Sequence, residues 1–302
     1  MPPSSSLPAP RRPVLLFDVF SLLYRAFFAL PPMNTARGEP TSALYGFSAL
    51  VLKMLRQEQA TRAAFALDRP DQTLRKAAFA GYKASREAAP TPLGQQVGRV
   101  HEILHALGFP AFAVAGYEAD DVLATLASEL RAAGEPALVV TGDLDLLQCA
   151  VGSTRVHAVG RGTQGRSYDE AAVWARFGVA PHELPDWKAL VGDVTDEIPG
   201  VPGIGGKTAS ALVRRFGSVG GLLGRLEELE SASLRASITG LAAELPLWRD
   251  LTRLHADVPL PEGPRWAALD APAKQRAQEL FQQLEFKSLL PRLAALPVEG
   301  EP

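Results

Sequence analysis

The sequence is almost without cysteine, and it contains no long uncharged apolar run. Its one cysteine, Cys149, excludes an internal disulfide and a thiolate metal cluster, and it is typical of a reducing compartment. No apolar stretch approaches the ~20 residues that a transmembrane helix needs. The formal net charge of -2 excludes a uniformly basic nucleic-acid binder. We therefore expect a cytoplasmic protein that does not span a membrane.

The sequence does contain enough apolar material for a substantial core, because 47% of its 302 residues are hydrophobic. Short apolar runs alternate with helical patterns up to about residue 184. This alternation predicts an α/β fold with a mostly parallel central sheet flanked by helices. The expected strands are residues 14–17, 63–67, 112–114, 137–140 and 156–159, and the expected helices are residues 44–54, 95–107, 122–130 and 170–177.

Beyond residue 184 the strand signals stop, and helices separated by Gly and Pro take over. We therefore expect an α/β domain over residues 14–185, with an irregular excursion at about 69–94, followed by a helical region over residues 186–293. The Pro- and Ser-rich residues 1–13 and the short stretch 294–302 are expected to be tails.

Acidic residues follow three of the expected strands. Asp18, Asp68 and Asp143 each come at or just after a strand end. Because the carboxyl ends of parallel strands border one crevice, we expect these three side chains to converge there. Six further acids lie at a helix start or in short acidic pairs, and they are Glu118, Asp120, Asp121, Asp145, Asp193 and Asp196.

Any one of these acids is explained equally well as a turn residue or a helix N-cap. Eight or nine carboxylates in one crevice would, however, repel one another unless cations neutralised them. No His or Cys accompanies them, so the expected ligands are all oxygen and the expected ions are two Mg²⁺ or Mn²⁺. Two such ions about 4 Å apart can activate water and stabilise the leaving oxygen in phosphodiester hydrolysis.

Four segments carry a family resemblance: residues 22–32, 116–121, 141–148 and 198–205. They resemble, in the family's order, the 5′-nuclease domain of bacterial DNA polymerase I and its flap-endonuclease relatives, over roughly residues 14–292. The resemblance implies a PIN-like 5′-nuclease fold with a C-terminal helix-hairpin-helix region. It also implies two sets of metal ligands: Asp18, Asp68, Glu118 and Asp120 for one ion, Asp143, Asp145, Asp193 and Asp196 for the other, with Asp121 as a further candidate.

One position departs from the family's pattern. The first aspartate is usually followed by Gly-Asn, and Val19-Phe20 stand there in this sequence. The missing amide could otherwise orient a ligand or contact substrate, so this change puts substrate preference in question. It is also the one feature that favours a non-catalytic DNA-binding module. All the main carboxylates remain, so an active enzyme is the leading hypothesis.

Basic residues gather between Lys53 and Arg86, where eight of them accompany only three acids. On charge alone, a solvated helix face explains this stripe equally well. In the resembling family the excursion is an arch that admits a single-stranded 5′ end. The resemblance then implies that Lys83 and Arg86 stabilise charge on the scissile phosphate. It also implies that Arg75 holds this phosphate. Tyr82 is a candidate for stacking on an unpaired base, with packing of the arch as the alternative.

A glycine-rich turn precedes the helical pattern that starts near residue 209. A nucleotide-binding P-loop fails on register, because the position five residues before Gly206 is Val201 instead of Gly. A helix-hairpin-helix fits better, since its turn and helix N-terminus bind DNA phosphate without reading sequence. A plain helix-helix turn is the alternative. The resemblance adds K⁺ as a candidate ion at the hairpin. The candidate DNA-binding residues are Gly200, Gly203, Gly205, Lys207 and Thr208.

The leading hypothesis is a structure-selective 5′-3′ exonuclease and flap endonuclease that acts on DNA flaps, nicks and 5′ ends in repair or replication. We expect a monomer in the cytoplasm, at the bacterial nucleoid, with a functional link to a DNA polymerase and a ligase. An RNA-processing nuclease is the alternative, although the hairpin favours duplex DNA. Only residues 294–302 follow the last helical pattern, so we expect the chain to work without an attached polymerase; a piece of a longer protein is the alternative.

Overall fold

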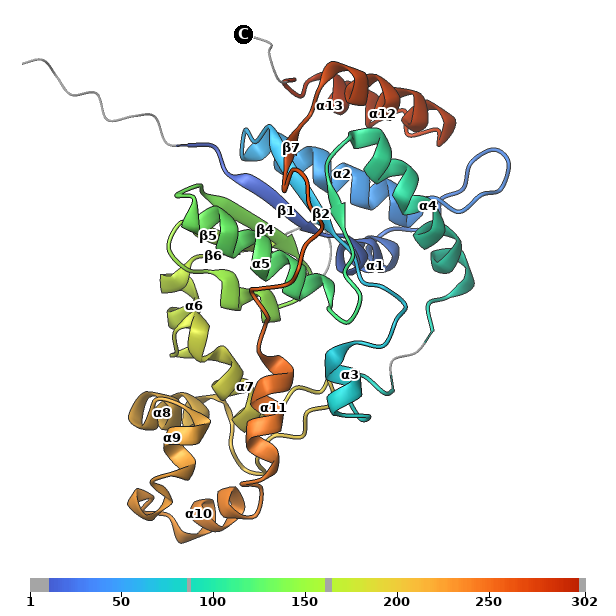
Figure 1. Cartoon of the computed structure of the whole chain (residues 1–302). Coiled ribbons are helices and arrows are strands. Elements are labelled where there is room, and N and C mark those ends of the chain that lie inside the picture. The colour runs from blue at the N-terminus through green and yellow to red at the C-terminus, as the bar shows by residue number, and fades with distance from the viewer. Residues whose placement is uncertain (1–10, 86–87, 161–164, 299–302) are drawn as a thin grey trace, which may run out of the picture.

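A sheet of seven strands forms the centre of the protein in a computed structural model that describes residues 11–85, 88–160 and 165–298 (Figure 1). Its order is β3-β2-β1-β4-β5-β6, and β7 pairs with β2. The first five strands along the chain run parallel, whereas β6 and β7 are antiparallel to their neighbours. The strands are β1 (Val14–Asp18), β2 (Arg62–Ala66), β3 (Ala111–Phe112), β4 (Ala137–Thr141), β5 (Thr154–Val159), β6 (Gly165–Tyr168) and β7 (Ala267–Ala268). The predicted mostly parallel α/β sheet is confirmed.

The central strand β1 lies between β2 and β4, and all five of its residues are buried. Its side chains alternate between two hydrophobic cores, with Leu16 in one and Leu15 and Phe17 in the other. Such a continuous apolar run is what a parallel strand covered on both faces requires. Helix α5 (Ala119–Ala132) covers the face of Leu16, and α1 (Val19–Ala29), α2 (Ser42–Gln57) and α4 (Thr91–Leu107) cover the other face.

A group of shorter helices forms the lower lobe in Figure 1. It begins with α6 (Glu170–Phe177), η2 (Pro181–Glu183) and α7 (Leu184–Val191). It continues through α8 (Gly206–Phe216), α9 (Val219–Leu223), η3 (Leu226–Glu228), α10 (Ala232–Thr239) and α11 (Glu244–Thr252). The short helix α3 (Leu74–Ala78) lies in the excursion after β2 and reaches toward this lobe.

The last part of the chain returns to the sheet. Strand β7 pairs with β2, α12 (Ala271–Gln283) packs on α4, and α13 (Leu290–Ala294) packs on α2. Phe281 and Phe286 are buried in the same core as Phe17. The predicted helical region 186–293 is therefore wrong for its last part, which belongs with the α/β core. A two-residue strand and a long-range docking of two helices leave no local signal in the sequence.

Among the described residues, no helix combines the length and the apolar character needed to cross a membrane.

Candidate active site

The first group of acids lies at the carboxyl edge of the sheet, where the predicted convergence takes place. Asp18 is the last residue of β1, and its Oδ2 accepts a hydrogen bond of 2.6 Å from the Thr141 hydroxyl at the end of β4. Its Oδ1 caps helix α1 by accepting from the Ser21 amide. Asp68 follows β2, and its Oδ1 accepts from the Ala119 amide at the start of α5, at 2.8 Å. Three strand ends and two helix starts thus meet at one place.

Several aspartate side chains lie close together at this edge, and their negative charges affect one another. Burial, with the nearby charges of Asp68 and Asp143, raises the pKa of Asp18 to about 7. Burial also raises the pKa of Asp120, and Asp143 and Asp18 add to the effect. Asp68 and Asp143 therefore disfavour the ionised form of Asp18, and Asp143 and Asp18 disfavour that of Asp120. The donor set is all oxygen, so these residues fit a hard divalent cation.

The second group of acids is Asp145, Asp193 and Asp196, whose nearest carboxylate oxygens all lie within 4.8 Å of one another. Asp145 starts the 3-10 helix η1 (Asp145–Cys149), and its amide donates to Asp143 Oδ1 at 2.9 Å. Asp193 pairs with Ile198 through two backbone hydrogen bonds of 2.8 Å, which close the loop that carries Asp196. The described residues that could hold a metal ion thus include all three of these predicted ligands.

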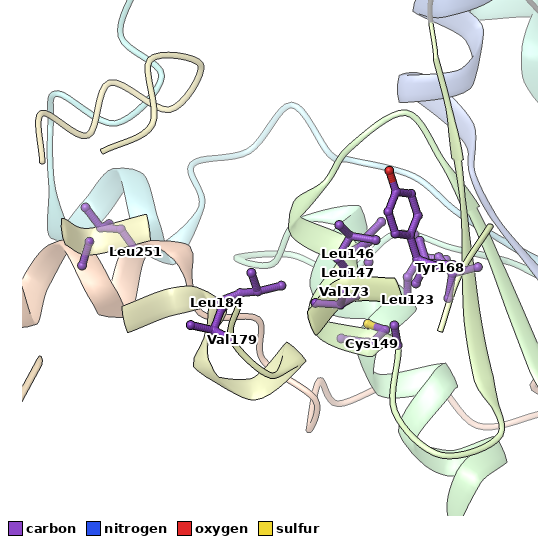
Figure 2. Packing of buried hydrophobic residues seen from close by; sticks show 14 of the residues in the cluster. Leu123, Leu146, Leu147, Cys149, Tyr168, Val173, Val179, Leu184 and Leu251 are labelled. Atoms are coloured by element: carbon purple, nitrogen blue, oxygen red, sulfur yellow. The ribbon is translucent and has the colours of Figure 1, made fainter. Parts of the chain in front are cut away.

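Hydrophobic packing holds η1, which begins with Asp145, in place. Figure 2 shows Leu146, Leu147 and Cys149 beside Leu123 and Tyr168, and all five side chains are buried. Burial raises the pKa of the Cys149 thiol to about 12, so this cysteine is a packing residue. A helix fixed on its apolar side keeps the Asp145 carboxylate in one position.

Two basic residues of this site did not stand out in the sequence. Lys188, on α7, places its ammonium between two of the acids, 2.6 Å from Asp193 Oδ2 and in direct contact with Asp145 Oδ1. Burial favours the neutral acid, but the Lys188 charge outweighs it and holds the pKa of Asp193 below its ordinary value. Arg25, on α1, donates to the Gly142 carbonyl next to Asp143. The only sequence signal for Lys188 is its position five residues before Asp193.

Arg75 and Asp121 bind each other inside the protein, which differs from the roles that the sequence predicts for them. The Arg75 guanidinium is buried and uses all five of its N–H groups: on Asp121, on Glu118, and on the carbonyls of Leu251 and Arg253. It has no donor left for a phosphate, so its predicted catalytic role is wrong. Asp121 is fully buried, and both of its oxygens accept hydrogen bonds within the protein. Its predicted role as a metal ligand is therefore wrong as well.

Glu118 links the excursion after β2 to the acidic edge. Its Oε2 accepts from the Lys83 ammonium at 3.1 Å, and the Tyr82 hydroxyl lies 3.1 Å from it and 3.2 Å from Asp196 Oδ2. The Tyr82 ring is buried in the core, so the predicted stacking on a base is wrong, and the packing alternative holds. Lys83 lies in the left-handed region, with φ 49°. Arg86 lies outside the described residues.

Carboxylates on two elements surround the Lys83 ammonium. Besides Glu118, Asp196 Oδ1 lies 3.7 Å from it. Burial opposes its charge, but Glu118 and Asp196 outweigh burial and raise the pKa of Lys83 above its ordinary value. Lys83 is therefore a cation at the edge of the acidic site.

The glycine-rich turn joins α7 to α8. Gly203, with φ 83°, and Gly205, the N-cap of α8, would leave an added Cβ in open space. Lys207 and Thr208 are exposed in the first turn of α8. Gly200 differs, because a Cβ there would lie 2.4 Å from the Gly192 backbone nitrogen, so its small size is needed for packing. Four of the five predicted hairpin residues thus share one exposed turn.

The two residues that replace the family's Gly-Asn begin helix α1. Val19 is fully buried, and Phe20 packs partly buried against the same core. Their side chains stabilise the packing of α1 on the sheet, and neither offers a polar group to the acids.

Comparisons with known proteins agree with this architecture. Residues 13–178 match the model of the 5′-3′ exonuclease N-terminal resolvase-like domain, and residues 179–275 match that of the 5′-3′ exonuclease C-terminal SAM fold. DNA polymerase I of Mycobacterium leprae is 40% identical over 292 residues, which are 95% of this chain and 32% of that protein. The thermostable DNA polymerase I of Thermus thermophilus is 36% identical over 297 residues, which are 97% and 35%. The chain thus spans about a third of the length of these relatives.

Solved structures share the fold at low sequence identity. A T5 5′-exonuclease with bound divalent metal ions (zinc) aligns with a TM-score of 0.68 and 17% identity, over 94% of this chain and 99% of that one. A bacteriophage T5 flap endonuclease complex with DNA and metal ions gives 0.65 and 19%, over 94% and 99%. The catalytic core of Rad2 in complex with a DNA substrate gives 0.60 and 17%, over 93% of each chain.

Proposed function

Because this chain belongs to the 5′-3′ exonuclease family, we propose that it hydrolyses DNA phosphodiester bonds at or near 5′ ends, as a structure-selective exonuclease and flap endonuclease in repair or replication. One observation carries the proposal: two groups of carboxylates from separate elements adjoin one another at the carboxyl edge of the sheet. Such an all-oxygen site fits two hard divalent ions, which we propose to be Mg²⁺ or Mn²⁺.

The first ion would be held by Asp18, Asp68, Glu118 and Asp120, and the second by Asp143, Asp145, Asp193 and Asp196. The pKa of Asp18, raised by burial and by Asp68 and Asp143, supports a cation among the first set. The oxygens of Asp145, Asp193 and Asp196, which lie within 4.8 Å of one another, support three of the four members of the second set. When bound, such ions lower the pKa of a water and stabilise the leaving oxygen.

The chain's own cations would hold and orient the substrate phosphate. Arg75 and Lys83 are the described basic side chains of the excursion that reach the acids. Because every N–H of Arg75 is already used within the protein, we assign the scissile phosphate to Lys83. Arg86 is proposed as its companion on the resemblance alone. A basic group beside the site also offsets the repulsion between the acids and a DNA phosphate.

Duplex DNA would be held at the hairpin, away from the acids. Gly203, Gly205, Lys207 and Thr208 present an exposed turn and the N-terminus of α8, which suit a phosphate without base readout. K⁺ is the proposed ion at that turn. We further propose that the chain is a cytoplasmic monomer that acts beside a polymerase and a ligase, a link supported by relatives named DNA polymerase I.

The test is cleavage of a labelled DNA flap by the whole purified chain, with Mg²⁺ or Mn²⁺ and no polymerase, followed by sizing of the products. The proposal predicts short products from the 5′ end that vanish with a chelator. Binding of the flap without any product would favour the non-catalytic module. Preferential cleavage of a matched RNA flap would favour an RNA-processing nuclease.

A further inference from the structure

Lys188 is the only basic residue of helix α7, and its side chain points into the acidic cluster instead of into solvent. Its side chain is 14% exposed, close to the 9% of Asp145 and the 17% of Asp193. The ammonium contacts one oxygen of each of these acids. An ordinary surface ion pair would be far more exposed and would contribute little to stability. Lys188 is instead a largely buried cation shared by two carboxylates.

The same two carboxylates belong to the proposed site for the second ion. Asp145, Asp193 and Asp196 offer oxygens within 4.8 Å of one another. Opposite ligands of one Mg²⁺ lie roughly 4 Å apart, because each Mg–O bond is about 2.1 Å. The carboxylates are therefore already gathered at the spacing of a single ion. Asp145 and Asp193 cannot give the same oxygens to the ammonium and to a metal at full strength.

We propose that Lys188 is a positioning residue that serves as a built-in counter-cation for the second metal site. Without metal, its ammonium keeps Asp145 and Asp193 together against their mutual repulsion. When a divalent ion binds, the ammonium must leave, and the flexible four-carbon stem of lysine permits this without moving α7. The energy of displacing it lowers the affinity of the second ion in the free protein.

This competition has a chemical consequence for the site. A preformed cluster whose negative charge Lys188 partly offsets lets the chain fold without metal. The competition makes the second ion the weaker of the two. The released ammonium is then available for an anionic group near the metal, and in the proposed function that group is a DNA phosphate. The inference rests on the proposed two-ion site, but its test measures metal binding and stability instead of cleavage.

The test is calorimetric titration of the metal-free whole chain with Mn²⁺ alone, in the wild type and in Lys188→Met. Removing the competing charge should tighten the weaker Mn²⁺ site about 10-fold, the size of effect typical of residues that adjoin metal ligands. Lys188→Arg keeps a cation there and should stay near the wild type. Lys287→Met removes the same charge from an exposed position outside the cluster, and it should also leave both affinities unchanged.

Thermal unfolding in a chelator gives the second readout. Lys188→Met should unfold at a lower temperature than the wild type, because Asp145 and Asp193 lose their shared cation. Added Mn²⁺ should raise the unfolding temperature of the variant again. Equal affinities in wild type and Lys188→Met, with two ions bound, would overturn this inference alone. A single ion bound by both would overturn the two-ion proposal with it. If Lys188→Met does not fold, Lys188→Gln replaces it in the same titration, with the same criteria.

Discussion

Arg75 holds both carboxylate oxygens of Asp121, each through a guanidinium nitrogen 2.6 Å away. The pair joins the excursion after β2 to the start of α5. Through the carbonyls of Leu251 and Arg253, the same guanidinium also ties both segments to the end of α11. Three parts of the chain far apart in sequence thus meet at one buried ion pair. Its role is to fix the frame that carries Glu118, next to the acidic edge.

Asp121→Ala should therefore destabilise the fold without removing a metal site. Breaking a buried pair leaves an uncompensated charge on Arg75 and typically costs about 3–5 kcal/mol. Urea unfolding measures this loss, and Mn²⁺ titration of the folded variant should still find two ions. Asp71→Ala, which removes an exposed acid, is the matched control and should change neither. A lost ion with unchanged stability would restore Asp121 as a ligand.

Asp18→Asn should raise the unfolding temperature of the metal-free protein. Asp18 is buried beside Asp68 and Asp143, whose charges oppose its own, and removing one negative charge relieves that repulsion. Asn remains a good N-cap for α1, so the contact with Ser21 is kept. Differential scanning calorimetry with and without a chelator measures the effect, which should shrink or reverse when Mg²⁺ is present. Asp270→Asn, at the N-cap of α12 on the surface, should show no gain. A lower melting temperature for Asp18→Asn in the chelator would contradict the crowded-charge account.

The sheet and the acidic edge could be predicted because their signals are local. Buried parallel strands are short apolar runs, and Asp18, Asp68 and Asp143 follow them directly, so the topology of a parallel sheet brings them together. The roles of Arg75 and Asp121 could not be predicted in this way. The partners of Arg75 at 251 and 253, and the His255 amide that donates to Asp121, lie more than a hundred residues away. A buried arginine that uses every donor looks the same in sequence as a phosphate-binding one.

Dependence on contacts between residues far apart in sequence also explains why the environments of Tyr82, Lys188 and β7 were not predicted. Tyr82 is an aromatic residue in a basic stretch, a pattern typical of base stacking, and only its burial shows that it packs inward. Lys188 lies in an apolar helix with no motif around it, and it becomes informative only when α7 places it between Asp145 and Asp193. Strand β7 is two residues long and far from its partner in sequence, which no local pattern reveals.

Lys83→Ala should slow flap cleavage about 10²-fold or more, with a smaller change in KM, if its ammonium stabilises charge on the phosphoryl oxygens. The structure already places this ammonium 3.1 Å from Glu118, at the acidic edge. Lys76→Ala removes an exposed charge from the same excursion and should leave kcat near the wild-type value. Single-turnover kinetics separates the two effects. A change in KM alone would make Lys83 a binding residue.

Lys207→Ala should weaken binding to duplex-containing substrates of every sequence to a similar degree. The exposed lysine at the start of α8 would lose about one phosphate contact, so the plot of log affinity against log salt should become shallower by about one unit. Fluorescence anisotropy over a range of salt concentrations measures both quantities. Lys287→Ala is the control for loss of an exposed charge elsewhere. An effect that depends on DNA sequence would exclude the hairpin role.

The most direct test of metal-dependent hydrolysis at this edge is Asp143→Asn, assayed on a labelled DNA flap with Mg²⁺ beside the wild type. Asp143 adjoins both groups of acids, since it affects the pKa of Asp18 and accepts from the Asp145 amide. The proposed function predicts that the wild-type chain alone cleaves the flap, and that Asp143→Asn binds it with nearly unchanged affinity but produces no fragments. Cleavage by Asp143→Asn at the wild-type rate would contradict the assignment of the active site.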